Sequence, residues 1–255
     1  MLQFDKLGKD LKSVLKKHSM KIKAHSGDVY DISDGIISFS ADLSAFREHD
    51  YSEEMLDDVI MRRYKMAEAE SRMVSFTNGQ AFLRFVLTAA ENVTPSMVTL
   101  DFTDNLKKVA VYTADDHDYK LISGVQLKKW DVPKEVAFSA ADKNMCRMMD
   151  KCEFRTVKLR PEVNAVEIEP VYPEFMASFI ACGDFRMKMS KLLGDKFIVL
   201  APSNESVIAV DNLTEEFYGE ITKIVSKEYR AAEKPLTTSV LIFDRSGVTE
   251  AGNIH

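Results

Sequence analysis

The chain has 255 residues, of which 45% are hydrophobic and 29% are charged, the composition of an ordinary soluble globular protein. Its 34 Lys and Arg residues against 40 Asp and Glu residues give a formal net charge of −6. An acidic chain has no overall positive field to attract a phosphate backbone, so general nucleic-acid binding is disfavoured. A chain of this size can also bury a core without disulfides or a structural metal.

The three cysteines, Cys146, Cys152 and Cys182, are odd in number and form no Cys-x-x-Cys pair. No His lies at zinc-ligand spacing from them, so we expect reduced thiols and no cofactor. Lysines interrupt the apolar residues at the start of the sequence, and no window approaches the roughly 20 apolar residues of a membrane span. The expectation is a cytoplasmic protein without membrane insertion.

The first third of the chain predicts a helix, a strand and a second helix. Apolar residues recur at spacings of three and four over residues 4–15, with lysines between them, which is typical of an amphipathic helix. Residues 36–43 alternate apolar and polar side chains, as a half-buried strand does. Asp50 and Glu53 have the spacing of a capping box, which predicts the start of a helix that continues toward Arg72.

The middle of the chain predicts short strands at residues 82–87, 106–113 and 119–122, the last two flanking a polar turn. Asp131 follows at a position where it can cap a helix with Pro133 in its first turn. Alanines and methionines then recur at spacings of four and three, which indicates the buried side of that helix.

The second half of the chain is more regular. A helix over residues 185–193 is expected to end at Gly194, and Thr214 is placed to cap a later helix. The residues between 201 and 206 are typical of a hairpin turn. Strands are predicted at residues 154–159, 165–169, 175–181, 196–201, 206–210 and 239–244.

Mixed helix-like and strand-like segments along the whole length predict an α+β fold. We expect mixed or antiparallel sheets covered by amphipathic helices. The domain prediction is a single α+β unit over residues 1–255, with any boundary between two tightly joined lobes near residues 95–105.

The densest ionisable cluster in the sequence is Asp115, Asp116, His117 and Asp118. Three carboxylates and an imidazole suit a divalent cation. However, four adjacent residues cannot all converge on one ion, and a turn between two strands is polar in any case. A metal site and a solvated turn both stay open, and the solvated turn is favoured.

Cys182 is the best candidate nucleophile, because it precedes a predicted helix whose N-terminus can lower the pKa of a thiol. No base is placed beside it, and a cysteine after an apolar run is also an ordinary core residue. Cys182, Asp184 and His117 are therefore the catalytic candidates, each with a structural alternative. The sequence contains neither a phosphate-binding glycine-rich loop nor a G-x-S-x-G motif.

Four stretches of the sequence are informative when taken in order. The first is residues 35–43 with the helix from Ser52, and the second is residues 105–115 with 119–122 and 130–133, continuing to Asn144 and Met145. The third is residues 183–193, and the fourth is residues 197–202 with 206–210, the helix that follows and Pro235. In this order they resemble the YtpQ-like family, a group of uncharacterised bacterial proteins. The resemblance covers most of the chain and implies a bacterial cytoplasmic protein. It transfers no catalytic residue, and the chain departs from the family at residues 76–97, where Arg84 is the only basic residue.

Two functions stay open from the sequence. The lack of a convergent acid, base, nucleophile or metal motif favours a non-enzymatic protein that binds a basic or neutral protein partner, and an immunity or regulatory role would fit the acidity. The alternative is a hydrolase or other small-molecule enzyme whose site is assembled from distant residues, which spacing arguments cannot reveal. The identity of the partner and the oligomeric state are left open.

Overall fold

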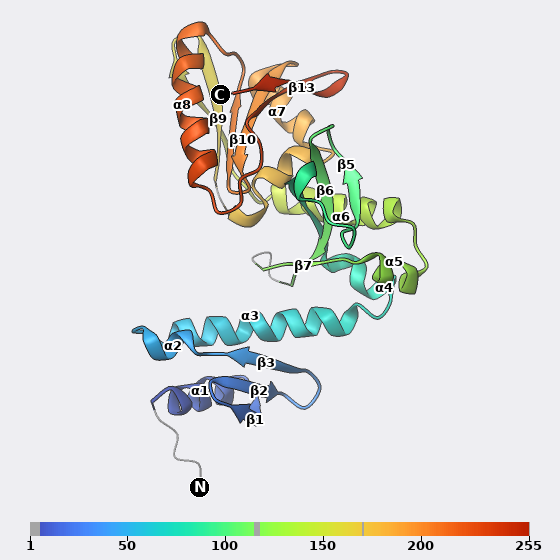
Figure 1. Ribbon diagram of the computed structural model, residues 1–255, viewed down its shortest axis with the longest axis vertical. Helices are drawn as coiled ribbons and strands as arrows, with labels where there is room; N and C mark the ends of the chain where they lie inside the picture. Colours follow the sequence, from blue (N-terminus) through green and yellow to red (C-terminus); the bar gives the residue numbers. More distant parts are fainter. Residues whose placement is uncertain (1–5, 115–117, 170, 255) are drawn as a thin grey trace. The chain divides into compact units, whose positions relative to one another are not determined.

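The computed structural model describes residues 6–114, 118–169 and 171–254 (Figure 1). The chain divides into two compact units, Met1–Gly79 and Gln80–His255. Both combine helices with antiparallel sheets, which confirms the prediction of an α+β fold.

The division between the two units lies before the range that we expected. Residues 95–105 belong to the second unit, where strand β5 (Thr99–Asp101) pairs with strand β6 (Leu106–Tyr112). A sequence stretch that supplies a strand to a sheet cannot also be a linker. The break follows Gly79 instead.

The first unit contains one three-stranded sheet with helices packed on it. The strands are antiparallel in the order β1-β2-β3, and a hairpin turn at Gly27 joins the first two. Gly27 has φ +58°, a conformation that favours glycine. The elements are α1 (Lys6–Lys17), β1 (Lys21–Ser26), β2 (Val29–Ser33), β3 (Ser38–Asp42), α2 (Ala45–Glu48), α3 (Glu53–Arg72) and α4 (Phe76–Gly79).

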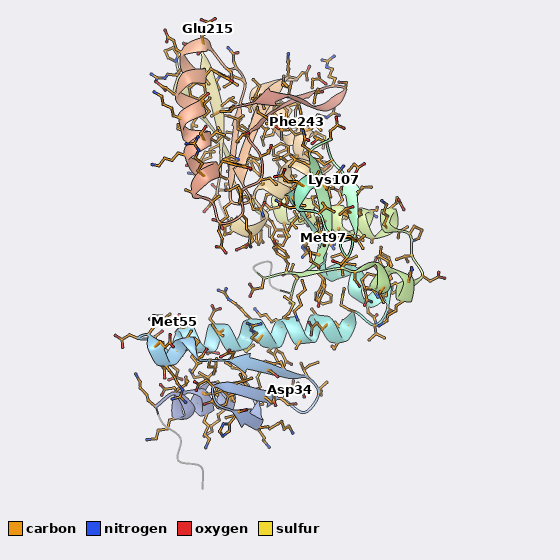
Figure 2. The ribbon with its side chains drawn as sticks, in the orientation of Figure 1. Asp34, Met55, Met97, Lys107, Glu215 and Phe243 are labelled. Carbon is orange, nitrogen blue, oxygen red and sulfur yellow. The ribbon has the colours of Figure 1, made fainter. Side chains whose placement is uncertain are left out.

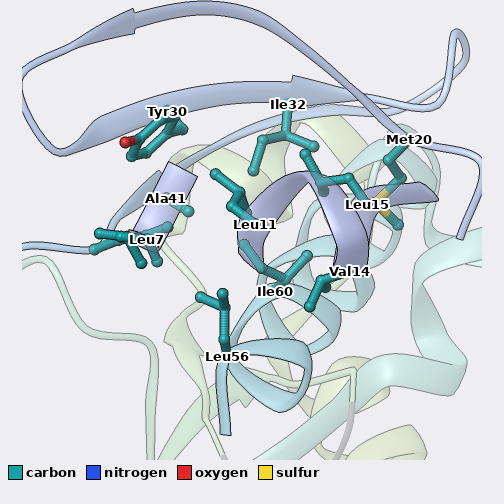
Figure 3. Close-up of a cluster of buried hydrophobic side chains, with 11 residues drawn as sticks. Leu7, Leu11, Val14, Leu15, Met20, Tyr30, Ile32, Ala41, Leu56 and Ile60 are labelled. Atoms are coloured by element: carbon teal, nitrogen blue, oxygen red, sulfur yellow. The ribbon is translucent and has the colours of Figure 1, made fainter. Parts of the chain in front are cut away.

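The core of the first unit lies between α1, α3 and one face of this sheet (Figure 3). The apolar stripe predicted for the N-terminal helix forms its centre, with Leu11 and Val14 fully buried. Burying such a side chain stabilises the fold by about 1.5–3 kcal/mol. The buried residues of the cluster are Leu7, Leu11, Val14, Leu15, Met20, Tyr30, Ile32, Ala41, Leu43, Leu56 and Ile60.

Two features of the first unit differ from the sequence expectation. The cap of α3 is Ser52, whose side chain accepts a hydrogen bond from the Met55 N–H, and not Asp50. The hairpin formed by β1 and β2 was not predicted, because the lysines of β1 leave it with little apolar alternation.

The second unit begins with a sheet of strands β4 (Leu83–Ala89), β5, β6 and β7 (Lys120–Leu121). The order is β4-β6-β5, and β7 also pairs with β6. Helix α5 (Gly124–Trp130) follows, and α6 (Lys134–Met149) packs against β4. The strands predicted in this region are therefore present with their bounds shifted by a few residues.

A six-stranded antiparallel sheet forms the rest of the second unit, in the order β13-β12-β10-β11-β9-β8. Helix α8 (Glu215–Ala231) packs on one face and α7 (Phe185–Leu193) on the other (Figure 1). Thr214 caps α8 as predicted, and α7 ends at Gly194 with φ +93°. The strands are β8 (Phe154–Arg160), β9 (Val163–Ile168), β10 (Phe197–Ser203), β11 (Ser206–Val210), β12 (Ser239–Asp244) and β13 (Gly247–Asn253).

Two expectations for the second unit were wrong. The strand expected over residues 175–181 is instead two short 3-10 helices, η3 (Pro173–Phe175) and η4 (Ala177–Ala181). Every residue of η4 is buried, so its sequence carries no periodicity that separates helix from strand. Asp131 does not cap the helix that follows it. It ends α5 in the left-handed conformation, with φ +54°.

Side-chain hydrogen bonds tie η4 and α6 to the first sheet of this unit. The Ser178 hydroxyl accepts the buried Leu87 N–H at 2.9 Å. The Asn144 amide donates to the carbonyl oxygens of Gln80 at 2.8 Å and Leu83 at 2.9 Å. These bonds satisfy backbone groups on the side of β4 that faces away from β6 and in the residues just before β4.

None of the helices in the described part of the chain has both the length and the apolar composition needed for a bilayer span.

Asp34, in the turn between β2 and β3 (Figure 2), gives the first unit a predictable pH dependence. Its carboxylate accepts the N–H groups of Ile36 and Ile37 at 2.7 and 2.8 Å and the Tyr64 hydroxyl at 2.7 Å, which lowers its pKa below the ordinary 3.8. The resulting stabilisation is present above that value and is lost as pH falls through the native pKa.

We therefore expect Asp34→Asn to speed amide hydrogen exchange of β2 and β3 at neutral pH, and Tyr64→Phe to do so less. The difference from the unsubstituted protein should shrink below pH 3.8. An effect of Asp34→Asn that is the same at every pH would contradict this account.

Asn144→Ala should destabilise the second unit by about 1 kcal/mol, because it removes an amide that donates to the carbonyl groups of Gln80 and Leu83, while the Arg84 guanidinium still donates to Leu83. Denaturant unfolding followed by the fluorescence of the single tryptophan, Trp130, measures this. Lys143→Ala, at the exposed neighbouring position of α6, is the matched control and should change stability by less than about 0.5 kcal/mol. Equal effects of the two substitutions would refute the role of the Asn144 amide.

Candidate functional site

The sequence predicted a cation site or a solvated turn at Asp115, Asp116, His117 and Asp118. Asp115, Asp116 and His117 lie outside the described residues, while Asp118 is exposed just before β7. The geometry of these four residues therefore contributes nothing to the choice of a site, and the cation site there stays a prediction.

Cys182 lies at the junction of η4 and α7, and its side chain is 5% exposed. The structure brings it to two residues of α6, Asp142 and Cys146, which lie one helical turn apart on one face. One carboxylate oxygen and the two sulfur atoms all lie within 4.8 Å of one another. We call these three residues the thiol–carboxylate cluster.

The turn that contains Cys182 also holds the carboxylate of the cluster. The Gly183 N–H donates to Asp142 Oδ1 at 3.1 Å, and Asp142 Oδ2 lies 4.0 Å from the Cys146 sulfur. A Cβ atom at Gly183 would lie 3.1 Å from Asp142 Oδ2, closer than ordinary van der Waals contact. The missing side chain at Gly183 therefore lets the carboxylate approach the turn.

The two thiols of the cluster differ in their electrostatics. The Cys182 thiol donates to the Ser178 carbonyl, and the neighbouring Cys182 side chain and Asp184 N–H lower the pKa of Cys146. Burial raises the pKa of Cys182 well above its ordinary value. The sequence predicted that the N-terminus of this helix lowers the pKa of Cys182. In the structure the Asp184 N–H at that end of the helix lowers the pKa of Cys146 instead.

Lys108 of β6 brings a positive charge to the cluster. Its Nζ donates to the Ala181 carbonyl at 2.5 Å and lies 4.6 Å from the centre of the Phe85 ring. Burial lowers the pKa of Lys108, and the negative charge of Asp142 opposes that shift. Asp142 and Lys108 thus form a partly buried pair of opposite charges beside the two thiols.

A second candidate site lies entirely within the first unit, between α1 and β1. It is a groove of about 900 Å³. Its apolar lining comprises Leu15, Met20, Ile22 and Ala24, and its basic lining comprises Lys12, Lys16, Lys21, Lys23 and His25. We call this the α1–β1 groove. An apolar floor with a charged rim is typical of a binding site for a peptide or a similar amphipathic ligand.

The backbone of β1 runs along this groove. β1 is the first strand of the order β1-β2-β3, and within the described residues no strand pairs with its outer edge. The pairing of β1 with β2 shifts by one residue between Ile22 and Ala24. Ile22 therefore pairs with Ile32 and His25 with Tyr30, and both partners are buried in the core. An edge strand presents N–H and C=O groups that can pair with an added strand.

The charge of this region is opposite to that of the whole chain. Residues 6–25 contain seven lysines and one aspartate, a local formal charge of +6 within a chain of −6. Lys17 is bound to Glu53 at 2.6 Å and lies outside the groove lining, while Lys16, Lys21 and Lys23 are exposed beside it. The α1–β1 groove therefore offers positive charge to a ligand.

The chain was compared with protein-family models, with curated proteins and with solved structures, and none of them matches it. The resemblance to the YtpQ-like family stays a prediction.

Sequence reasoning missed most members of both sites. Asp142 and Cys146 have the i, i+4 spacing of neighbours on one helix face, which was a usable signal. Nothing in the sequence connects them with Cys182 or with Lys108, which come from other elements. For the groove, the usable signal was the run of lysines followed by the turn at Gly27.

Proposed function

We propose that this chain is a non-enzymatic protein that binds an extended, acidic segment of a partner protein in the α1–β1 groove. The observation that carries the proposal is the coincidence of an open strand edge, an apolar floor and a basic rim in one groove. An added strand would pair with the backbone of β1 and place alternate side chains toward the floor and the rim.

The charge of the groove, more than the charge of the whole chain, decides which partner fits. The overall charge of −6 favoured a basic or neutral partner, but a partner contacts only the local surface. Lys16, Lys21 and Lys23 attract carboxylates and repel basic segments. A strand of alternating acidic and apolar residues matches both linings of the groove.

A protein segment suits this groove better than a nucleic acid does. Backbone N–H and C=O groups of β1 are complementary to another polypeptide backbone. Among the described residues, the lining contains no arginine and no Phe, Tyr or Trp, the residues on which bases stack. In line with the family resemblance, we propose that this binding takes place in a bacterial cytoplasm.

The alternative function, a hydrolase or other small-molecule enzyme, has less support. Of its candidate residues, Cys182 is buried, which raises the pKa of its thiol well above the ordinary value, and Asp184 is exposed just before α7. We therefore do not assign a catalytic role to either residue.

The test is fluorescence anisotropy with a labelled short peptide of alternating Glu and Val residues, titrated with the full chain. We expect saturable binding that falls with added salt, because lysine–carboxylate attraction at a surface is screened. The double substitution Lys21→Glu and Lys23→Glu should weaken binding at least about tenfold, or 1.4 kcal/mol. Lys65→Glu, at an exposed position of α3, changes a charge outside the groove and should have little effect.

Two further probes separate strand addition from simple charge attraction. The same peptide with alternate backbone nitrogens methylated cannot pair fully with β1 and should bind much more weakly. A single-stranded DNA of equal charge should not compete. Binding that survives methylation, that DNA displaces, or that Lys65→Glu weakens equally would overturn the proposal, as would the absence of binding.

A further inference from the structure

We propose that Asp142, Cys146 and Cys182 bind a zinc ion in the second unit, with water as the fourth ligand. This site is independent of the α1–β1 groove, which lies in the other unit. The three ligand atoms are two sulfurs and one carboxylate oxygen, all within 4.8 Å of one another.

The donor set favours zinc over the other common cations. Two thiolates and a carboxylate suit a borderline-soft ion, whereas Mg²⁺ and Ca²⁺ prefer oxygen alone. In a tetrahedral zinc site the sulfur atoms lie about 3.8 Å apart, and sulfur and oxygen about 3.5 Å. The Cys146 sulfur and Asp142 Oδ2 lie 4.0 Å apart, so the side chains need to close by only a few tenths of an ångström for this pair.

The groups around the cluster already orient its ligands. Gly183 N–H donates to Asp142 Oδ1, which leaves Oδ2 directed toward the Cys146 sulfur. The Cys146 thiol in turn points its hydrogen at Oδ2, 4.0 Å away. In protein metal sites, groups that hydrogen-bond a metal ligand hold that ligand in place. Loss of such a group typically lowers metal affinity about 10–100-fold. The chain therefore orients Asp142 toward Cys146 before any ion arrives.

Charge and protons balance when zinc binds. One Zn²⁺ forms a bond to each sulfur, both S–H bonds break, and two protons leave to solvent. Asp142 and Lys108 carry opposite charges before and after, so the total charge of the cluster does not change. Lys108 stays outside the ligand set, because its Nζ donates to the Ala181 carbonyl. No net charge is added to this partly buried region.

The ion can reach the cluster from one side. Cys182 is buried, but Asp142 and Cys146 are half-buried and Gly183 is exposed. The fourth position is thus on the solvent side, as in zinc sites with three protein ligands. Cys152, which follows α6, is buried and donates to the Met148 carbonyl of that helix, so it serves as an internal control.

The test uses the reduced full chain, freed of metal by a chelator and titrated with Co²⁺ and then with Zn²⁺. We expect one Co²⁺ per chain, with a thiolate-to-cobalt charge-transfer band and the intense visible bands of a four-coordinate ion. Zinc should displace it, and binding should release two protons per ion. Cys152→Ser should leave the spectrum unchanged.

Substitutions in the cluster distinguish a metal site from a chance proximity of the three side chains. Cys146→Ser and Cys182→Ser should each abolish stoichiometric binding. Asp142→Asn keeps an oxygen that can accept the Gly183 N–H, so it preserves the fold, and it should weaken zinc about 10–100-fold while both sulfur ligands remain. Gly183→Ala, which presses a Cβ against Asp142, should weaken zinc by about tenfold.

The proposal fails if no cobalt–thiolate band forms, or if Cys152→Ser lowers binding as much as Cys146→Ser does. It also fails if Asp142→Asn folds normally and binds zinc with unchanged affinity. If either cysteine variant does not fold, as judged by circular dichroism, Asp142→Asn alone decides the question. Loss of the peptide binding described for the α1–β1 groove would not bear on this result.

Discussion

A backbone N–H that is buried at the edge of a sheet must find an acceptor, because leaving it unpaired costs about 1–3 kcal/mol. In the second unit the Leu87 N–H finds one in the hydroxyl of Ser178. This bond holds η4 against β4, and α6 packs against the same strand. The turn after η4 consequently meets α6, which is why Cys182 lies beside Cys146. The thiol–carboxylate cluster depends on how one sheet edge is completed.

The elements that the sequence predicts well are those with local signals. Helices α7 and α8 have an amphipathic stripe, and a glycine stop or a threonine cap marks one end of each. The hairpin of β10 and β11 has a polar turn between two apolar runs. Fully buried segments are different. In η4 every side chain is buried, so no contrast between two faces exists from which helix or strand can be deduced.

The candidate sites were harder to predict, for two separate physical reasons. The cluster joins residues of α6, β6 and the turn at Gly183, and their approach is a consequence of tertiary packing that no spacing rule contains. The positive charge of the α1–β1 groove was missed because only the net charge of the whole chain was considered. A net charge of −6 describes the whole chain, although residues 6–25 alone carry +6. Field strength at a surface falls off within about 10 Å at moderate salt, so only the local value matters to a ligand.

The lysines of β1 also bear on how this chain behaves at high concentration. Two identical edge strands that approach each other bring Lys21 and Lys23 of both copies together, and the like charges repel. Natural sheets use such lysines to avoid joining edge to edge into aggregates. The strand is thereby kept from self-association while its backbone stays open to a segment of opposite charge. Selectivity at this edge then comes from which strands it rejects as much as from those it accepts.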